Sequence, residues 1–227
     1  MKILSFFFCS LFCLPLFAQD TDQAALRETL SQELLLNGKE YRHYYAKTKG
    51  NQYISEQTIL EGKLWYEGVY YENLQLNYDI YNNLLFAAFV NESEKIYIIL
   101  NQAKIQAFEF IGMRFVNLQD SSIAGLPGGI YEEFFRQGER RLMIKHRKVL
   151  TKDVDTLEGT LQKFDRKTIY YLIEGGVVYQ IKNKKDLIEA LGEDEGFARF
   201  LKENKIKLRK RRDDFEFNLA KALKYQS

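Results

Sequence analysis

The densest set of residues that could do chemistry is a run of cations near the carboxyl end of the chain. Seven lysines and arginines fall within residues 202–212, and Ile206 and Leu208 interrupt them. Exposed cations that lie within a Debye length, about 8 Å at physiological salt, attract an anionic surface additively. The sequence therefore predicts an anion-binding surface with Ile206 and Leu208 turned inward, made by Lys205, Lys207, Arg209, Lys210 and Arg212.

Three acids follow this segment at once and offer a second interpretation. Asp213, Asp214 and Glu216 stand within helical pairing distance of the cations. Opposite charges three or four residues apart on a helix attract one another. If they pair here, the segment is only a solvated helix surface.

The histidines and serines give no catalytic pattern. His43 and His146 have no metal-ligand or acid–base spacing around them, so each is expected to be a surface or strand-face residue. Ser121 and Ser122 lie in a glycine-rich stretch, but no G-x-S-x-G motif exists.

The acids of residues 153–159 (DVDTLEG) resemble a calcium loop only superficially. The EF-hand spacing needs a third oxygen ligand before an inner glycine and a distal glutamate, which this stretch lacks. The sequence also contains neither a phosphate loop nor a dinucleotide-binding motif. We therefore expect no cofactor, no metal and no enzymatic activity.

The hydrophobic pattern indicates strands through most of the chain. Leu74, Leu76, Tyr78 and Ile80 alternate with Gln75, Asn77 and Asp79, which predicts a core face for the first set and a solvated face for the second. Asn82-Asn83 is a turn, and the continuous apolar run Leu84 to Val90 predicts a buried strand.

Turn residues divide the later strands into hairpins. Ile130 to Gln137 and Arg141 to Leu150 flank Gly138, and Thr151 to Gly159 is expected to be a polar loop. Thr168 to Glu174 and Val177 to Gln180 flank Gly175-Gly176, a two-residue connection that favours a primed hairpin turn. The stretch Asp120 to Gly129 is expected to be a long connection because it is rich in glycine.

After Asn183, the spacing of the apolar residues becomes that of a helix. Asn183 is a good N-cap, Asp186 follows three residues later, and Gly192 suits the helix end. Two more short helices are predicted by the apolar spacings of 197–201 and 215–223. The expected fold is α+β, mainly an antiparallel β-meander, as a sandwich or a partly open barrel, with a short helical C-terminal region.

The expected organisation has four parts. A signal peptide over residues 1–18 precedes an N-terminal β-meander over 19–120, a β-hairpin region over 121–182 continuous with it, and C-terminal helices over 183–227. The signal peptide follows from Lys2, the apolar run Ile3 to Phe17 and the small Ala18. That run is shorter than the roughly 20 residues that span a membrane, so no transmembrane helix is expected in the mature chain.

Charge and cysteine content limit the partners. Both cysteines, Cys9 and Cys13, lie in the predicted signal peptide, so the mature chain would have no disulfide. The formal net charge of the 227 residues is +2, which gives no global field for nucleic acid.

Several short motifs resemble a family of uncharacterised exported proteins of Bacteroidetes-type bacteria. The similarity runs from about Leu34 to Tyr225 and is carried by residues 36–41 (LNGKEY), 71–74 (YENL), 78–81 (YDIY), 170–171 (YY) and 184–187 (KKDL). The resemblance implies a location in the cell envelope and lends no catalytic residues.

These observations predict an exported protein, periplasmic or associated with the outer membrane, with a non-enzymatic binding or structural role. Its partner would be an envelope protein or an anionic lipid or polymer. One alternative is a carrier that holds an apolar ligand in a partly open barrel, since the apolar run Leu84 to Val90 could line one. A hydrolase of unrecognised geometry is a remaining alternative.

Overall fold

The computed structural model describes residues 33–43, 45, 48–91, 94–119, 123–155, 159–192, 195–208 and 214–225. The account below concerns the compact unit that begins at Gly38. The predicted signal peptide and both cysteines lie outside the described residues. So do Arg209, Lys210 and Arg212 of the predicted anion-binding surface.

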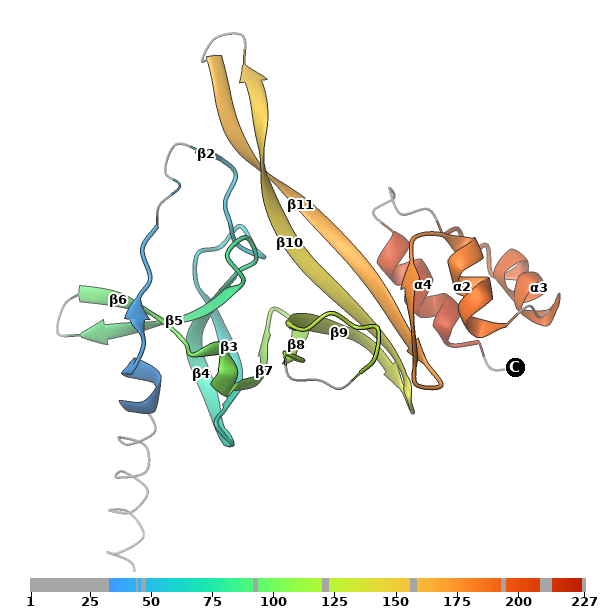
Figure 1. Cartoon of the computed structure of the whole chain (residues 1–227), viewed down its shortest axis with the longest axis horizontal. Helices are drawn as coiled ribbons and strands as arrows, with labels where there is room; N and C mark the ends of the chain where they lie inside the picture. Colours follow the sequence, from blue (N-terminus) through green and yellow to red (C-terminus); the bar gives the residue numbers. More distant parts are fainter. Residues whose placement is uncertain are drawn as a thin grey trace, which may run out of the picture. The chain divides into compact units, whose positions relative to one another are not determined.

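The described strands form one open sheet (Figure 1). Its order is β1 (Lys39–Glu40), β6 (Glu94–Ile99), β5 (Leu84–Asn91), β4 (Val69–Asp79), β3 (Leu60–Tyr66), β7 (Ile105–Phe110), β8 (Met113–Asn117), β9 (Ile130–Gln137), β10 (Arg140–Asp155), β11 (Gly159–Glu174) and β12 (Val177–Ile181). β2 (Thr48–Lys49) pairs parallel with β11, and the other pairs are antiparallel. The mainly antiparallel sheet with a helical C-terminal region is therefore confirmed.

The strand β4 follows the predicted alternation on one face only. Leu76, Tyr78 and Ile80 are buried and Gln75 is exposed, as expected, but Asn77 and Asp79 are buried, so the prediction of a solvated face is wrong for these two residues. The reason is that residues 51–59 cover this face. The Asn77 amide donates to the backbone carbonyls of Gln57 (3.0 Å) and Thr58 (2.6 Å), which satisfies it without water.

The two longest strands, β10 and β11, correct a second prediction. Residues 151–155 and 159 onward continue the strands, so the polar loop expected over Thr151 to Gly159 is wrong for these residues. Their pairing runs without a bulge from Arg141↔Ile173 to Asp155↔Gly159. Where the structure describes side chains in this stretch, Lys152 and Gln162 are exposed, which suits their polar character.

The predicted Gly175-Gly176 hairpin is confirmed. Its two glycines have φ of 55° and 78°, as a type I′ turn requires, and β11 pairs with β12 on either side. The Asp120 to Gly129 stretch belongs to the connection between β8 and β9, and its Leu126 packs with Tyr131 and Met143. The domain boundaries at residues 120 and 182 stay predictions.

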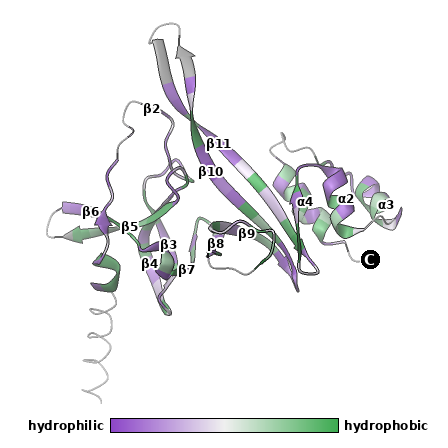
Figure 2. Ribbon diagram, in the orientation of Figure 1, coloured by the Kyte–Doolittle hydropathy of each residue, from purple (hydrophilic) through white to green (hydrophobic). Residues whose placement is uncertain are grey.

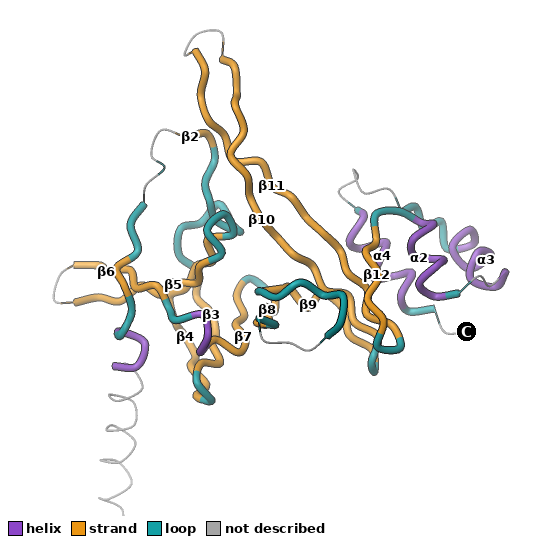
Figure 3. The backbone as a smooth tube through the Cα atoms, viewed as in Figure 1, coloured by secondary structure: helices purple, strands orange, loops and turns teal. Residues whose placement is uncertain are grey.

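Three described helices follow the sheet: α2 (Lys184–Leu191), α3 (Glu195–Glu203) and α4 (Phe215–Leu223) (Figure 3). Asn183 and Asp186 form a reciprocal capping box at α2, as predicted. The apolar faces of the helices pack on Leu142, Ile144 and Tyr170 of β10 and β11. Among the described residues, no helix is long and apolar enough to cross a membrane.

Candidate functional site: a basic ribbon

The pairing of β10 with β11 brings two cationic stretches together that are distant in the sequence. We call residues 145–152 of β10 and 162–168 of β11 the basic ribbon. It holds one acid, Asp165, against seven cations: Lys145, Arg147, Lys148, Lys152, Lys163, Arg166 and Lys167. Figure 2 shows hydrophilic residues along the middle of these strands and hydrophobic residues toward the helices.

Like charges face each other directly across the ribbon. Arg147 is paired with Lys167, and the next register position pairs Lys148 with Arg166. Successive residues of a strand point to opposite faces, so each face of the ribbon carries one of these cationic pairs. Like charges directly opposite in a sheet destabilise it.

The pair of Arg147 and Lys167 is the more accessible one. Both side chains are exposed, and within the described ranges neither lies within 4.0 Å of a carboxylate. Asp165 on the same face is already engaged, since it accepts a hydrogen bond from the Thr151 hydroxyl (2.7 Å) and lies 3.5 Å from Nζ of Lys163. The bond from Thr151 is the main reason why the pKa of Asp165 is lowered.

Lys145 marks the end of this face nearest the core. Its Nζ donates to the carbonyl of Gly128 (2.9 Å) and lies 4.9 Å from the ring centroid of Tyr131. Burial, and secondly the charge of Arg147, lower the pKa of Lys145. Lys145 is thus fixed by the protein, whereas Arg147 and Lys167 face solvent.

On the other face, Lys148 and Arg166 both form hydrogen bonds within the protein. Nζ of Lys148 donates to the backbone carbonyl (2.6 Å) and the side-chain oxygen (2.9 Å) of Asn51, and burial lowers its pKa. Nη2 of Arg166 lies 3.0 Å from Nδ1 of His146. Because a guanidinium can only donate, Nδ1 accepts, and the neutral imidazole carries its hydrogen on Nε2.

His146 also contacts the carboxylate of Glu132, which is distant in the sequence and was not predicted as its partner. Its Nε2 lies 2.5 Å from Oε2 of Glu132 on β9, and the two side chains are only 1% and 7% exposed. An acid and an imidazole in this arrangement suit general acid–base catalysis, but their burial keeps them from a substrate. Through Nδ1 of His146, the pair contacts Arg166, which is exposed at the surface of the ribbon.

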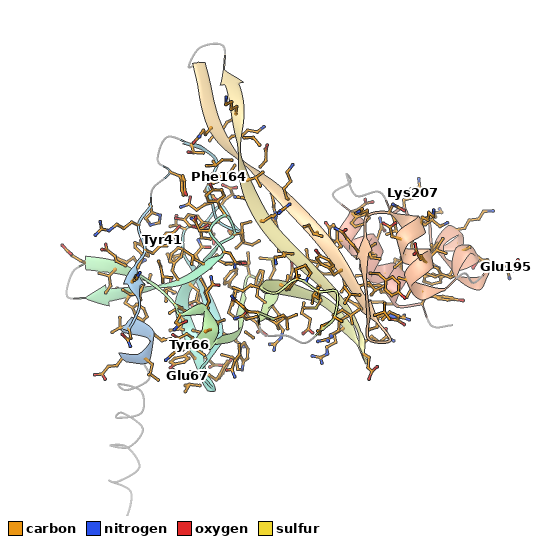
Figure 4. All side chains as sticks on the ribbon, in the orientation of Figure 1. Tyr41, Tyr66, Glu67, Phe164, Glu195 and Lys207 are labelled. Atoms are coloured by element: carbon orange, nitrogen blue, oxygen red, sulfur yellow. The ribbon has the colours of Figure 1, made fainter. Side chains whose placement is uncertain are left out.

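The predicted surface of residues 205–212 is described only in part. Lys205 and Lys207 are exposed, and the structure confirms that Ile206 and Leu208 are buried, in the cluster that contains Ile144 and Tyr170. Figure 4 labels Lys207 on the helical region. Glu216, one of the acids expected to neutralise these cations, accepts a hydrogen bond from the Tyr170 hydroxyl (2.9 Å).

A second polar cluster surrounds Asp79 and is buried. Asp79 accepts from the Tyr41 hydroxyl (2.7 Å), and the Gln52 amide donates to the hydroxyls of Tyr41 (3.0 Å) and Tyr53 (3.1 Å). The hydroxyl of Tyr53 also contacts exposed His43, and the ring of Tyr41 stacks on Phe86. Burial raises the pKa of Tyr53 to about 12 and raises that of Tyr41 further. This network stabilises the fold around β4 and β5.

Neither cluster is arranged as a metal centre. No group of three or more histidine, cysteine, aspartate or glutamate side chains in the described ranges is close enough together to hold an ion. Comparisons with protein-family models, with curated proteins and with solved structures found no match. The candidate site therefore stands on the geometry of the ribbon alone.

Sequence reasoning missed the ribbon, although the signal was present. Residues 145–148 (KHRK) hold three cations in four positions, and Arg166-Lys167 is a cationic pair. The expected strands ended at Leu150 and began again at Thr168, so Arg166 and Lys167 lay outside any expected strand and the pairing of Arg147 with Lys167 was not predicted.

Proposed function

We propose that this chain is an exported, non-enzymatic envelope protein that binds the anionic headgroups of a lipid bilayer through the basic ribbon. The observation that carries the proposal is the pairing of like charges, Arg147 with Lys167 and Lys148 with Arg166. A folded chain loses stability by holding such pairs together. An anionic surface supplies the missing counter-charge and turns the repulsion into attraction.

The magnitude is sufficient for reversible binding. A lysine or arginine near an anionic membrane contributes about 1 kcal/mol, and the contribution falls off within a Debye length. Arg147 and Lys167 alone therefore contribute about 2 kcal/mol, which corresponds to about thirtyfold in affinity.

Lys205 and Lys207 are exposed cations on the side of the sheet that carries Arg166, opposite to Arg147 and Lys167. The residues beside them, Ile206 and Leu208, pack in the core cluster of Ile144 and Tyr170. Alternation along β11 places Arg166 on the same face as Tyr170. The described cations Lys205 and Lys207 thus belong to the face of Lys148 and Arg166, and not to the face of Arg147 and Lys167.

Co-sedimentation with vesicles tests the proposal. The parent and the variant Arg147→Gln/Lys167→Gln are mixed with vesicles of phosphatidylglycerol and phosphatidylcholine, and with phosphatidylcholine alone, at low and at high salt. The parent should bind only the anionic vesicles, only at low salt, and about thirtyfold more tightly than the variant. The control Lys95→Gln/Lys185→Gln removes the same charge from exposed positions elsewhere.

Two results would overturn this assignment. Equal weakening by the variant and the control would mean that net charge, not the ribbon, attracts the vesicles. Equally tight binding of a duplex DNA oligomer would mean that the ribbon recognises polyanions in general and not a bilayer.

The alternative of an apolar carrier rests on the run Leu84 to Val90. Leu85 and Phe86 of this run are fully buried, and Phe86 stacks on Tyr41 with ring centroids 4.1 Å apart, which favours a role in core packing. A lipid retained by the protein in native mass spectrometry would favour the carrier.

A further inference from the structure

The sheet of described strands ends in β1 on one side and in β12 on the other (Figure 3). β1 is two residues long, and both of its residues, Lys39 and Glu40, are charged. β12 is five residues long (VVYQI), and it has no charge, no proline and no irregularity in its pairing with β11. Natural edge strands avoid association with other strands by being very short, by carrying charges or proline, or by forming a bulge. β1 has such protection and β12 does not.

The register of the last hairpin shows which backbone groups of β12 point outward. The type I′ turn joins Glu174 and Val177 as a hydrogen-bonded pair, and such pairs alternate along the hairpin with pairs that are not hydrogen-bonded. Val178 and Gln180 belong to the second kind. Their N–H and C=O groups therefore point away from β11, toward the outer edge.

This outer edge of β12 is open. The amide of Lys182, next in the alternation, donates to the side chain of Asp186 (2.7 Å), which agrees with its outward direction. Among the described residues, no hydrogen bond reaches the backbone of Val178 or Gln180 from that side. Val177 is 51% exposed, and Gln180 is exposed as well. An open edge of this kind accepts a further extended strand, which bonds to the free N–H and C=O groups.

We propose that the outer edge of β12 pairs antiparallel with β12 of a second copy of this chain, about a two-fold axis at Tyr179. In this register Val178 pairs with Gln180 of the second copy, and Gln180 pairs with its Val178, so every outward group of the two residues is bonded. Tyr179 lies opposite Tyr179 of the second copy, and aromatic side chains in such a position stabilise the pairing. Because β12 has no charge, no like charges oppose each other within the paired strands.

Neighbouring registers bond fewer of the outward groups. An axis at Val178 would place Gln180 opposite Gly176 in the turn. An axis at Gln180 would place Val178 opposite Lys182, whose amide already has a partner. The strand is therefore complementary to itself in the register centred on Tyr179.

The two-fold axis of this dimer is perpendicular to the sheet, so both copies present the face of Arg147 and Lys167 to the same side. A five-residue strand gives a small interface, so the dimer should exchange reversibly with the monomer. The inference goes beyond the proposed function and does not depend on it.

Sedimentation of the full-length protein over a series of concentrations tests the dimer. Val178→Pro removes an outward N–H but no hydrogen bond to β11, and Gln180→Lys places a charge on the open edge. Each variant should raise the dissociation constant of the dimer at least about tenfold. The control Gln75→Lys introduces the same charge at an exposed position of β4, which is paired on both sides, and should leave the dimer intact.

Hydrogen exchange locates the contact. The amides of Val178 and Gln180 should exchange more slowly as the concentration rises into the range of the dimer, whereas the amide of Lys182 should not change. If Val178→Pro fails to fold, Gln180→Lys still tests the edge. A parent that is monomeric at every concentration, or a dimer that persists in Gln180→Lys with unprotected Val178 and Gln180 amides, would overturn the proposal. These measurements contain no vesicles, so their outcome is independent of the lipid-binding assay.

Discussion

Oε2 of Glu132 lies 2.5 Å from Nε2 of His146, inside the sheet between β9 and β10. The other ring nitrogen accepts from exposed Arg166, so the three side chains form a line from the interior to the surface. Burial of a carboxylate is costly unless it is hydrogen-bonded, and here the imidazole provides that bond. His146 therefore links the stability of the folded chain to the position of Arg166 in the basic ribbon.

This link predicts strongly non-additive stabilities. His146→Leu leaves the Glu132 carboxylate buried without its partner and should lower the free energy of unfolding by about 3–5 kcal/mol. The double variant Glu132→Leu/His146→Leu should recover most of the loss, because it replaces the pair by apolar groups of similar volume. Urea unfolding of both single variants and the double variant measures the coupling. Additive losses would contradict the prediction.

Reversing one charge of the ribbon should stabilise the fold and weaken the binding of anionic vesicles. Lys167→Glu places an acid opposite Arg147, so it should raise the free energy of unfolding by about 0.5 kcal/mol. The same change should weaken binding to phosphatidylglycerol vesicles by more than the removal of one charge does. Urea unfolding and co-sedimentation measure the two effects, and Lys95→Glu on β6 is the control. A loss of stability in Lys167→Glu would show that the paired cations do not repel each other.

Alkaline pH should destabilise the fold through its buried tyrosines. Burial raises the pKa of Tyr53 and of Tyr131 to about 12, whereas tyrosine in an unfolded chain has a pKa of about 10. The folded chain therefore keeps protons that the unfolded chain releases. The stability is complete below about pH 10 and is lost as the pH rises toward about 12.

Urea unfolding between about pH 9 and pH 11 measures this loss. Each of the two tyrosines contributes up to about 1.4 kcal/mol per pH unit to the slope above pH 10. Tyr131→Phe and Tyr53→Phe should each make the slope shallower than that of the parent. If both variants keep the parent's slope, other groups control the alkaline transition.

Local signals in the sequence predicted the local elements. The Gly175-Gly176 turn and the capping box of Asn183 with Asp186 depend on neighbouring residues only, and both formed as expected. The core faces of β4 and of the three helices also follow from the spacing of apolar residues. These features require no knowledge of distant contacts.

Distant contacts account for what the sequence could not predict. Asp79 has the alternation of a solvated residue, but Tyr41, 38 positions away, donates to it in the interior. The charge of the ribbon exists because Arg147 and Lys167, 20 positions apart, are in register. The sequence shows the two cationic stretches of the ribbon, but only the fold decides whether such residues meet.

Lys205 of the predicted anion-binding surface has an unfavourable backbone conformation. Lys205 follows α3 and has a φ of 52°. The Ile206 amide donates to the carbonyl of Leu201 (2.9 Å), and the Lys205 amide donates to the carbonyl of Lys202 (3.1 Å). This is the Schellman motif, in which glycine is preferred at the left-handed position. Lysine at this position costs stability.

Lys205→Gly should therefore raise the free energy of unfolding by about 1 kcal/mol, because glycine adopts a positive φ without steric cost. If Lys205 contacts an anionic surface, the same substitution should weaken binding to phosphatidylglycerol vesicles about fivefold at low salt. Thermal unfolding and co-sedimentation measure the two effects, and exposed Lys207→Gly, outside this motif, is the control for stability. If the variant gains stability and binds vesicles as tightly as the parent, Lys205 does not belong to the binding surface. The basic ribbon would then bind the vesicles without Lys205.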